Sequence, residues 1–93
     1  MIKTLEEILK FAEEYPWNND LYLEDMNNLS LITRAKVLSE EDSENEKSFK
    51  YCLSISSLQD IVNNLKQQTE SPNTTQALEA LEYYLNNDAF ITI

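Results

Sequence analysis

Carboxylates are the side chains of this chain best suited to chemistry, and they gather in one short segment. Residues 39–46, SEEDSENE, contain no apolar residue. The segment carries five acids, which are Glu40, Glu41, Asp42, Glu44 and Glu46. Carboxylates act as general acids and bases, bind calcium, or attract the cations of a protein partner. Other features of the sequence distinguish among these roles.

Metal binding and catalysis both lack the residues that would support them. A calcium loop begun at Asp42 needs a glycine at its sixth position and an acid at its twelfth, where the chain has Lys47 and Leu53. The chain has no histidine and no glycine, so it lacks the usual general base at neutral pH and any glycine-rich phosphate loop. No catalytic spacing, zinc ligand set or serine-nucleophile motif is present. We therefore expect no enzymatic activity, no metal and no cofactor.

The single cysteine, Cys52, also argues against covalent catalysis. No histidine is available to activate it, and Lys50 is its only cation at strand spacing. We expect a small structural residue of a sheet. One cysteine excludes an intramolecular disulfide, which is typical of a protein of the reducing cytosol.

Composition indicates one compact, acidic domain over residues 1–93. Aspartate and glutamate number 17 against 7 lysines and arginines, for a net charge of −10, while 42% of residues are hydrophobic. This hydrophobic content argues against disorder, and the charge strongly disfavours nucleic acid as a ligand. No apolar run approaches the roughly 20 residues of a membrane span, and glutamates interrupt any signal-peptide core near the N-terminus. We expect a cytoplasmic protein, monomeric when free, that binds a basic partner.

Hydrophobic periodicity predicts how the acids are positioned. Thr4 and Glu7 have the spacing of a helical capping box, and Pro16 should end the helix that they begin. The apolar stripe of this helix consists of Leu5, Ile8, Leu9 and Ala12. A short strand follows at residues 21–24, between two Asn-Asn turns.

Two longer strands with alternating polarity are predicted next. In residues 31–38, Leu31, Thr33, Ala35 and Val37 share one face. In the second, Phe49, Tyr51, Leu53 and Ile55 share a dry face. The wet face carries Arg34, Lys36 and Lys50, which we expect to pair with nearby carboxylates. The acidic segment would then be a hairpin loop between the two strands.

The last third of the chain is predicted to be helical. Leu58, Ile61, Val62 and Leu65 form one stripe, which Ser56 or Ser57 would cap. After a break at Ser71-Pro72-Asn73, the second stripe consists of Ala77, Leu78, Leu81, Tyr84 and Leu85. The ending AFITI is β-prone and would form a short edge strand. The predicted fold is α+β: an N-terminal helix, a three-stranded antiparallel sheet, and two C-terminal helices on its dry face.

Two further groups of residues are candidates for partner binding. Asp20, Tyr22, Glu24 and Asp25 combine acids with an aromatic residue, as protein interfaces often do. The neighbouring Trp17 follows the first helix directly, and we expect it in the core. On the last helix, Tyr83 lies opposite the apolar stripe among Glu79 and Glu82. For the acidic segment, simple solvation and partner binding remain equally good interpretations.

Three segments carry a resemblance to a known class of proteins. The strings TLEEILKFAEEYPW, SISSLQDIVNN and YYLNNDAFI resemble a family of small uncharacterised bacterial domains. That family is similar in size and acidity to immunity proteins of contact-dependent growth inhibition and related polymorphic toxin systems. The resemblance covers about two-thirds of the chain, without the acidic segment. It transfers no binding residue, but it implies binding to a toxin.

Two hypotheses agree with these observations. In the first, the chain is a cytosolic immunity protein that binds and neutralises a toxin, such as a nuclease with a basic cleft. In the second, it is a phage- or plasmid-borne acidic mimic of nucleic acid that blocks a host defence protein. The missing catalytic residues disfavour a third hypothesis, a small enzyme. The gene neighbourhood would separate the first two.

Overall fold

The computed structural model describes residues 2–92, and its first helix begins at the predicted cap. Thr4 Oγ1 accepts a hydrogen bond from the Glu7 backbone N–H at 3.3 Å, and helix α1 spans Leu5–Lys10. The helix ends earlier than expected, because the backbone tightens into the 3₁₀ helix η1, Ala12–Glu14. Tyr15, which precedes a proline, is extended. The predicted stripe of α1 and η1 is buried.

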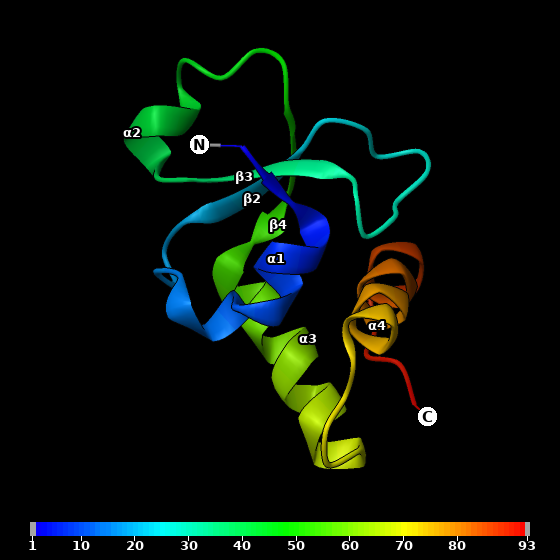
Figure 1. Cartoon of the computed structure of the whole chain (residues 1–93). Coiled ribbons are helices and arrows are strands. Elements are labelled where there is room, and N and C mark those ends of the chain that lie inside the picture. Colours follow the sequence, from blue (N-terminus) through cyan, green and yellow to red (C-terminus); the bar gives the residue numbers. More distant parts are fainter. Residues whose placement is uncertain (1, 93) are drawn as a thin grey trace.

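The fold is α+β, as predicted, with a four-stranded antiparallel sheet and helices packed against it (Figure 1). The strand order is β1-β3-β2-β4. The strands are β1 Lys3–Thr4, β2 Asp20–Leu23, β3 Arg34–Leu38 and β4 Lys50–Ser54. The edge strand therefore comes from the N-terminal end of the described chain. Residues 89–92 form no strand, and Ile93, the last residue of the predicted C-terminal strand, lies outside the described residues.

The prediction of a hairpin between the two long strands was wrong. Strand β2 pairs antiparallel with both β3 and β4 and lies between them. Its residues Leu21 and Leu23 are fully buried, which a central position provides. The acidic segment is thus a crossover connection and contains a short helix, α2, Glu40–Ser43. Ser39 Oγ caps α2 by accepting a hydrogen bond from the Asp42 N–H at 3.3 Å.

A β-bulge in β4 changes the face on which one predicted core residue lies. Leu21 is opposite Leu53, but the next residue, Tyr22, is opposite Tyr51, so Cys52 is the extra residue. Side chains alternate along a strand, and one extra residue therefore moves those before it to the other face. Tyr51, which we expected to be buried beside Leu53, is 55% exposed.

Two long helices complete the core. Helix α3, Ile55–Gln68, follows β4 directly and is capped by Ser54 rather than by Ser56 or Ser57. The Asn73 side chain begins α4, Thr74–Asn87, in a capping box with Gln76. The predicted stripe of α3 is buried, and in α4 the buried residues are Ala77, Ala80 and Leu81.

Helix α4 ends without the glycine that usually follows a helix. Asp88 takes the left-handed conformation instead, with φ of 52°, which aspartate tolerates better than most residues. Beyond it, the Phe90 ring lies 5.7 Å from that of Tyr84, and the Gln68 side chain donates to the Ile91 carbonyl at 2.8 Å. Phe90 and Ile91, which were expected within a C-terminal strand, therefore contact the ends of α4 and α3 instead.

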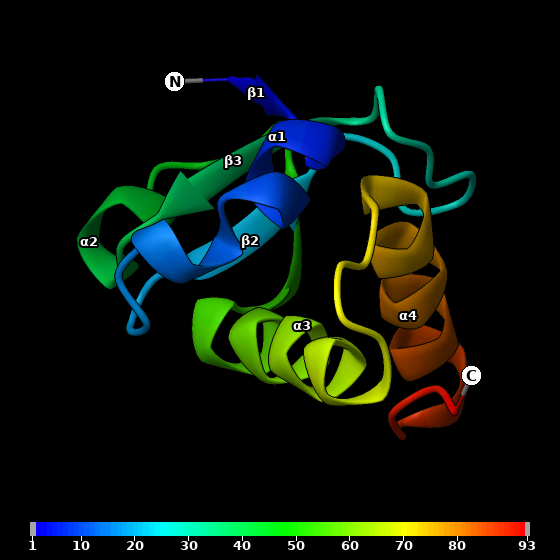
Figure 2. The same ribbon diagram turned by 60° about the horizontal axis from the view of Figure 1, so that its bottom comes forward.

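Helices α1, α3 and α4 share one core with the sheet. The sheet contributes Leu21, Leu23, Ala35 and Leu53, and we call this side its closed face. The opposite side, which carries Asp20, Tyr22, Lys36 and Tyr51, is its open face. In both views α2 and α4 lie at opposite sides of the molecule (Figures 1 and 2). Within residues 2–92, no helix combines the length and the apolar character that crossing a bilayer requires.

Candidate protein-binding surface

The acids of α2 gather at one end of the sheet together with Asp20. Asp20 begins β2 opposite Leu38, and the chain enters α2 two residues after Leu38. In Figures 1 and 2 the turn that leads into β2 and helix α2 lie at the same side of the molecule. We call this region the acidic end, and it consists of Asp20, Glu40, Glu41, Asp42 and Glu44.

The carboxylates of the acidic end are available to a partner. Those of Glu40, Glu41, Asp42 and Glu44 are exposed, and Asp20 is half-buried. Among residues 2–92, none of the five carboxylates takes part in an ion pair or a hydrogen bond. Five like charges in this arrangement create a negative field that attracts cations. The short helix also gives three of them a defined backbone.

Glu46 belongs to the same segment but has a different role. Its side chain is only 8% exposed, and Oε1 accepts a hydrogen bond from Lys36 Nζ at 2.7 Å. Its second oxygen accepts from the backbone N–H groups of Ser48 and Phe49, both at 2.9 Å. The hydrogen bond from Lys36, followed by that from the Phe49 N–H, lowers the pKa of Glu46 to about 2. Glu46 therefore holds the segment to the sheet, and our expectation of a solvated carboxylate here was wrong.

The contact of Glu46 with the sheet is completed by Phe49. The Lys36 ammonium lies 4.6 Å from the centroid of the Phe49 ring, within the range of a cation–π interaction. Phe49 is 6% exposed but lies outside the main core cluster. We expected Phe49 in the main core, but it is buried beneath the acidic segment. Lys36, Glu46 and Phe49 form a small packed unit, which we call the anchor.

Beside the anchor, two tyrosines pair on the open face. The rings of Tyr22 and Tyr51 are 5.8 Å apart and nearly perpendicular, at 79°, the edge-to-face geometry that aromatic rings favour. Burial raises the pKa of Tyr51, and the negative charge of Asp20 adds to this effect. Tyr22 is half-buried and lies on the face opposite to that of the buried Leu21 and Leu23. The sequence did not identify Tyr51 as a surface residue, because alternation alone does not reveal the bulge.

Glu24 and Asp25, at the other end of β2, are engaged within the chain. Glu24 pairs with Arg34 at 3.5 Å, and an Asp25 carboxylate oxygen accepts from the Asn27 N–H at 2.8 Å. The latter contact shapes a turn, as aspartate often does. Both side chains are exposed, but they lie away from the acidic end. The structure therefore separates them from Asp20, with which the sequence grouped them.

The candidates on α4 form a second surface. Glu79 and Tyr83 are exposed, and Glu82 lies in a shallow depression against the loop that carries Met26 and Asn27. Tyr83 is 40% exposed, which confirms that it lies off the apolar stripe. This surface and α2 are on opposite sides of the molecule (Figure 2). The twelve predicted residues thus do not form a single patch.

Trp17 is the second aromatic residue whose position differs from the prediction. It is 70% exposed rather than in the core. The Asn19 N–H donates to the Pro16 carbonyl at 3.1 Å, which makes Trp17 a central residue of a tight turn. Central turn residues project from the protein, and this turn leads into Asp20. The signal in the sequence was the Asn18-Asn19 pair, which was predicted to form a turn before the strand.

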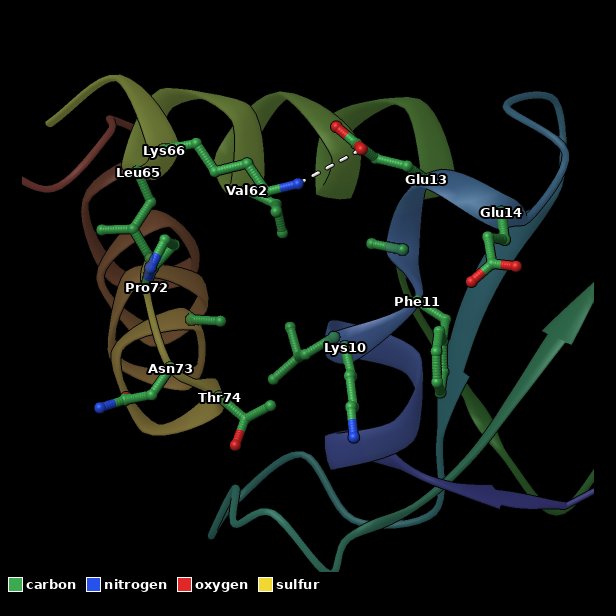
Figure 3. A pocket seen from close by; sticks show the side chains of 13 residues that line it. Lys10, Phe11, Glu13, Glu14, Val62, Leu65, Lys66, Pro72, Asn73 and Thr74 are labelled. Atoms are coloured by element: carbon green, nitrogen blue, oxygen red, sulfur yellow. Dashed lines mark hydrogen bonds and ion pairs between the residues drawn. The ribbon is translucent and has the colours of Figure 1, made fainter. Parts of the chain in front are cut away.

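An open hollow of about 570 Å³ lies between α1 and the start of α4. Beside it, a smaller groove lies between α1, α3 and the start of α4 (Figure 3). Its volume is about 210 Å³, below the roughly 300–1,000 Å³ of typical small-molecule sites. Its charged residues include Glu13 and Lys66, which pair with each other at 3.3 Å across one side (Figure 3). The groove is best interpreted as the seam where three helices meet.

Cys52 and the carboxylates provide little basis for a reactive centre. Burial raises the pKa of the Cys52 thiol to about 12, so almost none of it is the reactive thiolate at neutral pH. Over residues 2–92, no three His, Cys, Asp or Glu side chains are grouped so that they could hold a metal ion. The arrangement that the described residues do offer is a surface with unpaired negative charge and exposed aromatic rings.

Comparison with known proteins identifies a family but no activity. Neither the search of curated proteins nor that of solved structures gives a match. The resemblance to immunity proteins therefore stays a prediction. One family model matches the chain over residues 1–93. The chain belongs to the family described as Domain of unknown function (DUF7716).

Proposed function

We propose that this chain is a cytoplasmic immunity protein that neutralises a bacterial toxin by stoichiometric binding. The observation that carries the proposal is the acidic end, whose five carboxylates have no ion pair within the described chain. An enzyme that cuts nucleic acid needs a basic cleft, and an acidic protein is complementary to such a cleft. The partner is therefore a basic toxin domain, with a nuclease as the leading candidate.

The arrangement of the surface supports binding of a protein rather than binding of a free ion. Trp17 and Tyr51 expose large rings near the acids, and tryptophan and tyrosine are enriched among the residues that dominate binding energy. The anchor holds the acidic segment against β3, which lowers the entropy cost of ordering that segment on binding. Charge would speed association, while the rings would slow dissociation.

The first test uses the product of the neighbouring gene. We expect this product to be toxic when expressed alone, to be harmless when co-expressed with the chain, and to co-purify with it. In a titration of toxin activity, inhibition should be complete at about one molecule of inhibitor per toxin, because a binding protein does not turn over. Lasting inactivation of a molar excess of toxin would contradict the proposal. A neighbour that neither binds nor harms cells would contradict it too.

The two acidic surfaces provide matched variants for the same assay. One variant neutralises α2 through Glu40→Gln, Glu41→Gln and Asp42→Asn, and the other neutralises α4 through Glu79→Gln and Glu82→Gln. We expect weaker protection only from the α2 variant. The reverse result would move the contact surface to α4. If the chain instead inhibits a nucleic-acid-binding defence protein and no toxin, it acts as an acidic mimic of nucleic acid.

A further inference from the structure

Within the described chain, the two cations of the open face, Arg34 and Lys36, are already paired with carboxylates. Lys50, which we expected beside them, is instead opposite Leu23 because of the bulge, and it forms no ion pair within residues 2–92. Arg34 pairs with Glu24 at 3.5 Å. Lys36, directly opposite Tyr22, is held by Glu46 at 2.7 Å and by the Phe49 ring. Asp20 is on the same face, two residues before Tyr22, and makes no ion pair or hydrogen bond with another side chain of residues 2–92. The anchor therefore leaves Asp20 free to bind a cation from outside.

The tyrosine pair lies beside this carboxylate. Tyr51 is more than half exposed and is held at 79° to Tyr22, so its orientation is fixed by an edge-to-face contact. Tyr51 is directly opposite Tyr22, and Asp20 lies two residues before Tyr22 on the same face, so Asp20 and Tyr51 are diagonal neighbours across β2 and β4. The negative charge of Asp20 adds to the effect of burial, which raises the pKa of Tyr51. An aromatic face next to an unpaired carboxylate attracts a cation through its quadrupole and through the formal charge.

We propose that Asp20, Tyr22 and Tyr51 form a seat for one arginine side chain of a basic protein partner. The guanidinium stacks on the exposed face of Tyr51 and donates hydrogen bonds to the Asp20 carboxylate. Arginine fits better than lysine because its planar group stacks on a ring and pairs with a carboxylate through two parallel hydrogen bonds. The nature of the partner rests on the proposed function, whereas the seat is defined by the three residues.

The experiment uses two synthetic peptides of equal charge, hexa-arginine and hexalysine, and the full chain labelled with ¹⁵N. We expect hexa-arginine to bind about three- to tenfold more tightly, a range set by one cation–π contact and one paired carboxylate. Its largest amide shifts should fall at Asp20, Tyr22 and Tyr51. The exposed acids of α2 attract both peptides, so the ratio of the two affinities isolates the seat.

Variants test each part of the seat. Tyr51→Leu and Asp20→Asn should each bring the two affinities within about twofold, whereas Tyr51→Phe, which keeps the ring, should retain the preference. Tyr83→Leu is the matched control, because it removes another exposed tyrosine, on α4, and should change nothing. Circular dichroism checks the fold of each variant. If Tyr51→Leu fails to fold, the peptide affinities of Asp20→Asn and the amide shifts of the parent chain still test the proposal.

Equal affinity of the parent chain for the two peptides would overturn the proposal, as would a preference that survives in Asp20→Asn. This outcome is separate from that of the proposed function. If the parent chain neutralises the toxin but shows no preference for arginine, the proposed seat is rejected and the proposed immunity function is retained. A clear preference without any neutralisation would leave a seat for arginine on a protein with another partner.

Discussion

The two faces of the sheet are stabilised by different physical interactions. On the closed face, Leu21, Leu23, Ala35 and Leu53 are between 0% and 6% exposed and pack against three helices. On the open face, an ion pair, a cation–π contact and an edge-to-face tyrosine pair replace such a core. Burial of apolar area depends little on pH or salt, whereas the interactions of the open face depend on charge.

Because of this difference, we expect stability and partner binding to depend on different residues. The closed face has no charge to offer a partner, and it gives the chain its fold. The open face places its own cations in internal pairs and leaves the acidic end unpaired. We therefore expect substitutions to become less damaging to stability, and more specific for binding, from the closed face to the acidic end.

The largest loss of stability should come from the core that covers the closed face. Leu65, on α3, is fully buried, and Leu65→Ala should lower the free energy of unfolding by roughly 2–5 kcal/mol, because it removes buried methyl groups and leaves a cavity. Ile32→Ala is the control, since Ile32 is 79% exposed and should change the same quantity by about 0.5 kcal/mol or less. Chemical denaturation measures both. Equal effects would show that α3 does not cover the sheet as described.

The anchor should give the open face a dependence on pH. The folded-state pKa of Glu46 is lowered to about 2, below the ordinary value of about 4.3 in an unfolded chain. Its contribution to stability is therefore fully present above about pH 5 and is lost as the pH falls toward 2. Glu46→Gln should lower the free energy of unfolding at pH 7, because Lys36 loses its partner, and should match the parent chain near pH 2.

Glu44→Gln is the matched control for the anchor. It removes the same charge two residues away, but Glu44 is exposed and forms no ion pair among residues 2–92. Its effect on the free energy of unfolding should be small at every pH. If Glu46→Gln and Glu44→Gln follow the same pH curve, Glu46 is not held as the structure describes.

The closed face was accessible from the sequence because its signals are local. Two apolar stripes follow the helical period, and each is buried as predicted. They consist of Leu5, Ile8 and Leu9 in α1, and of Leu58, Ile61, Val62 and Leu65 in α3. The Thr4 cap is also set by neighbouring residues. Such local patterns are sufficient to predict the fold class, although they do not reveal the order of the strands.

The arrangement of the open face could not be predicted in the same way, because it depends on the pairing of strands that are far apart in the sequence. Whether residues 39–46 form a hairpin is decided by β2, which lies between β3 and β4. The bulge at Cys52 and the pairing of Lys36 with Glu46 arise from this order. The sequence therefore predicted twelve candidate residues but not that the acidic end, the pair Glu24 and Asp25, and the residues of α4 lie apart from one another. It also treated Glu46 as equivalent to its neighbours.

The tyrosine pair should contribute a smaller energy than the core. A double-mutant cycle with Tyr22→Leu and Tyr51→Leu should give a coupling energy of about 0.5–1.5 kcal/mol, as edge-to-face pairs do. The reason is the contact between ring edge and ring face at 5.8 Å. The same cycle with Tyr22 and Tyr83 is the control and should give no coupling. A coupling of zero for Tyr22 and Tyr51 would mean that Tyr51 has no fixed orientation on the open face.

The smallest effect on stability, and the clearest effect on binding, is expected at the acidic end. Neutralisation of Glu40, Glu41, Asp42 and Glu44 should change the free energy of unfolding by no more than about 0.5 kcal/mol, since these carboxylates are exposed and unpaired within residues 2–92. Exposed ion pairs contribute only about 0–1 kcal/mol each to a complex. Their combined field, however, reaches about 8–10 Å at ordinary salt and orients an approaching basic surface.

Association with the toxin should therefore become several-fold slower at low salt in this variant, with the dissociation rate changed less. Raising the salt should reduce the difference, because screening removes the same field in the parent chain. Stopped-flow measurements at two salt concentrations give both rates. An unchanged association rate at low salt would show that these acids serve only solubility and would leave Asp20 as the acid to examine. A large increase in the dissociation rate would instead place α2 inside the interface, where its carboxylates make direct, desolvated contacts.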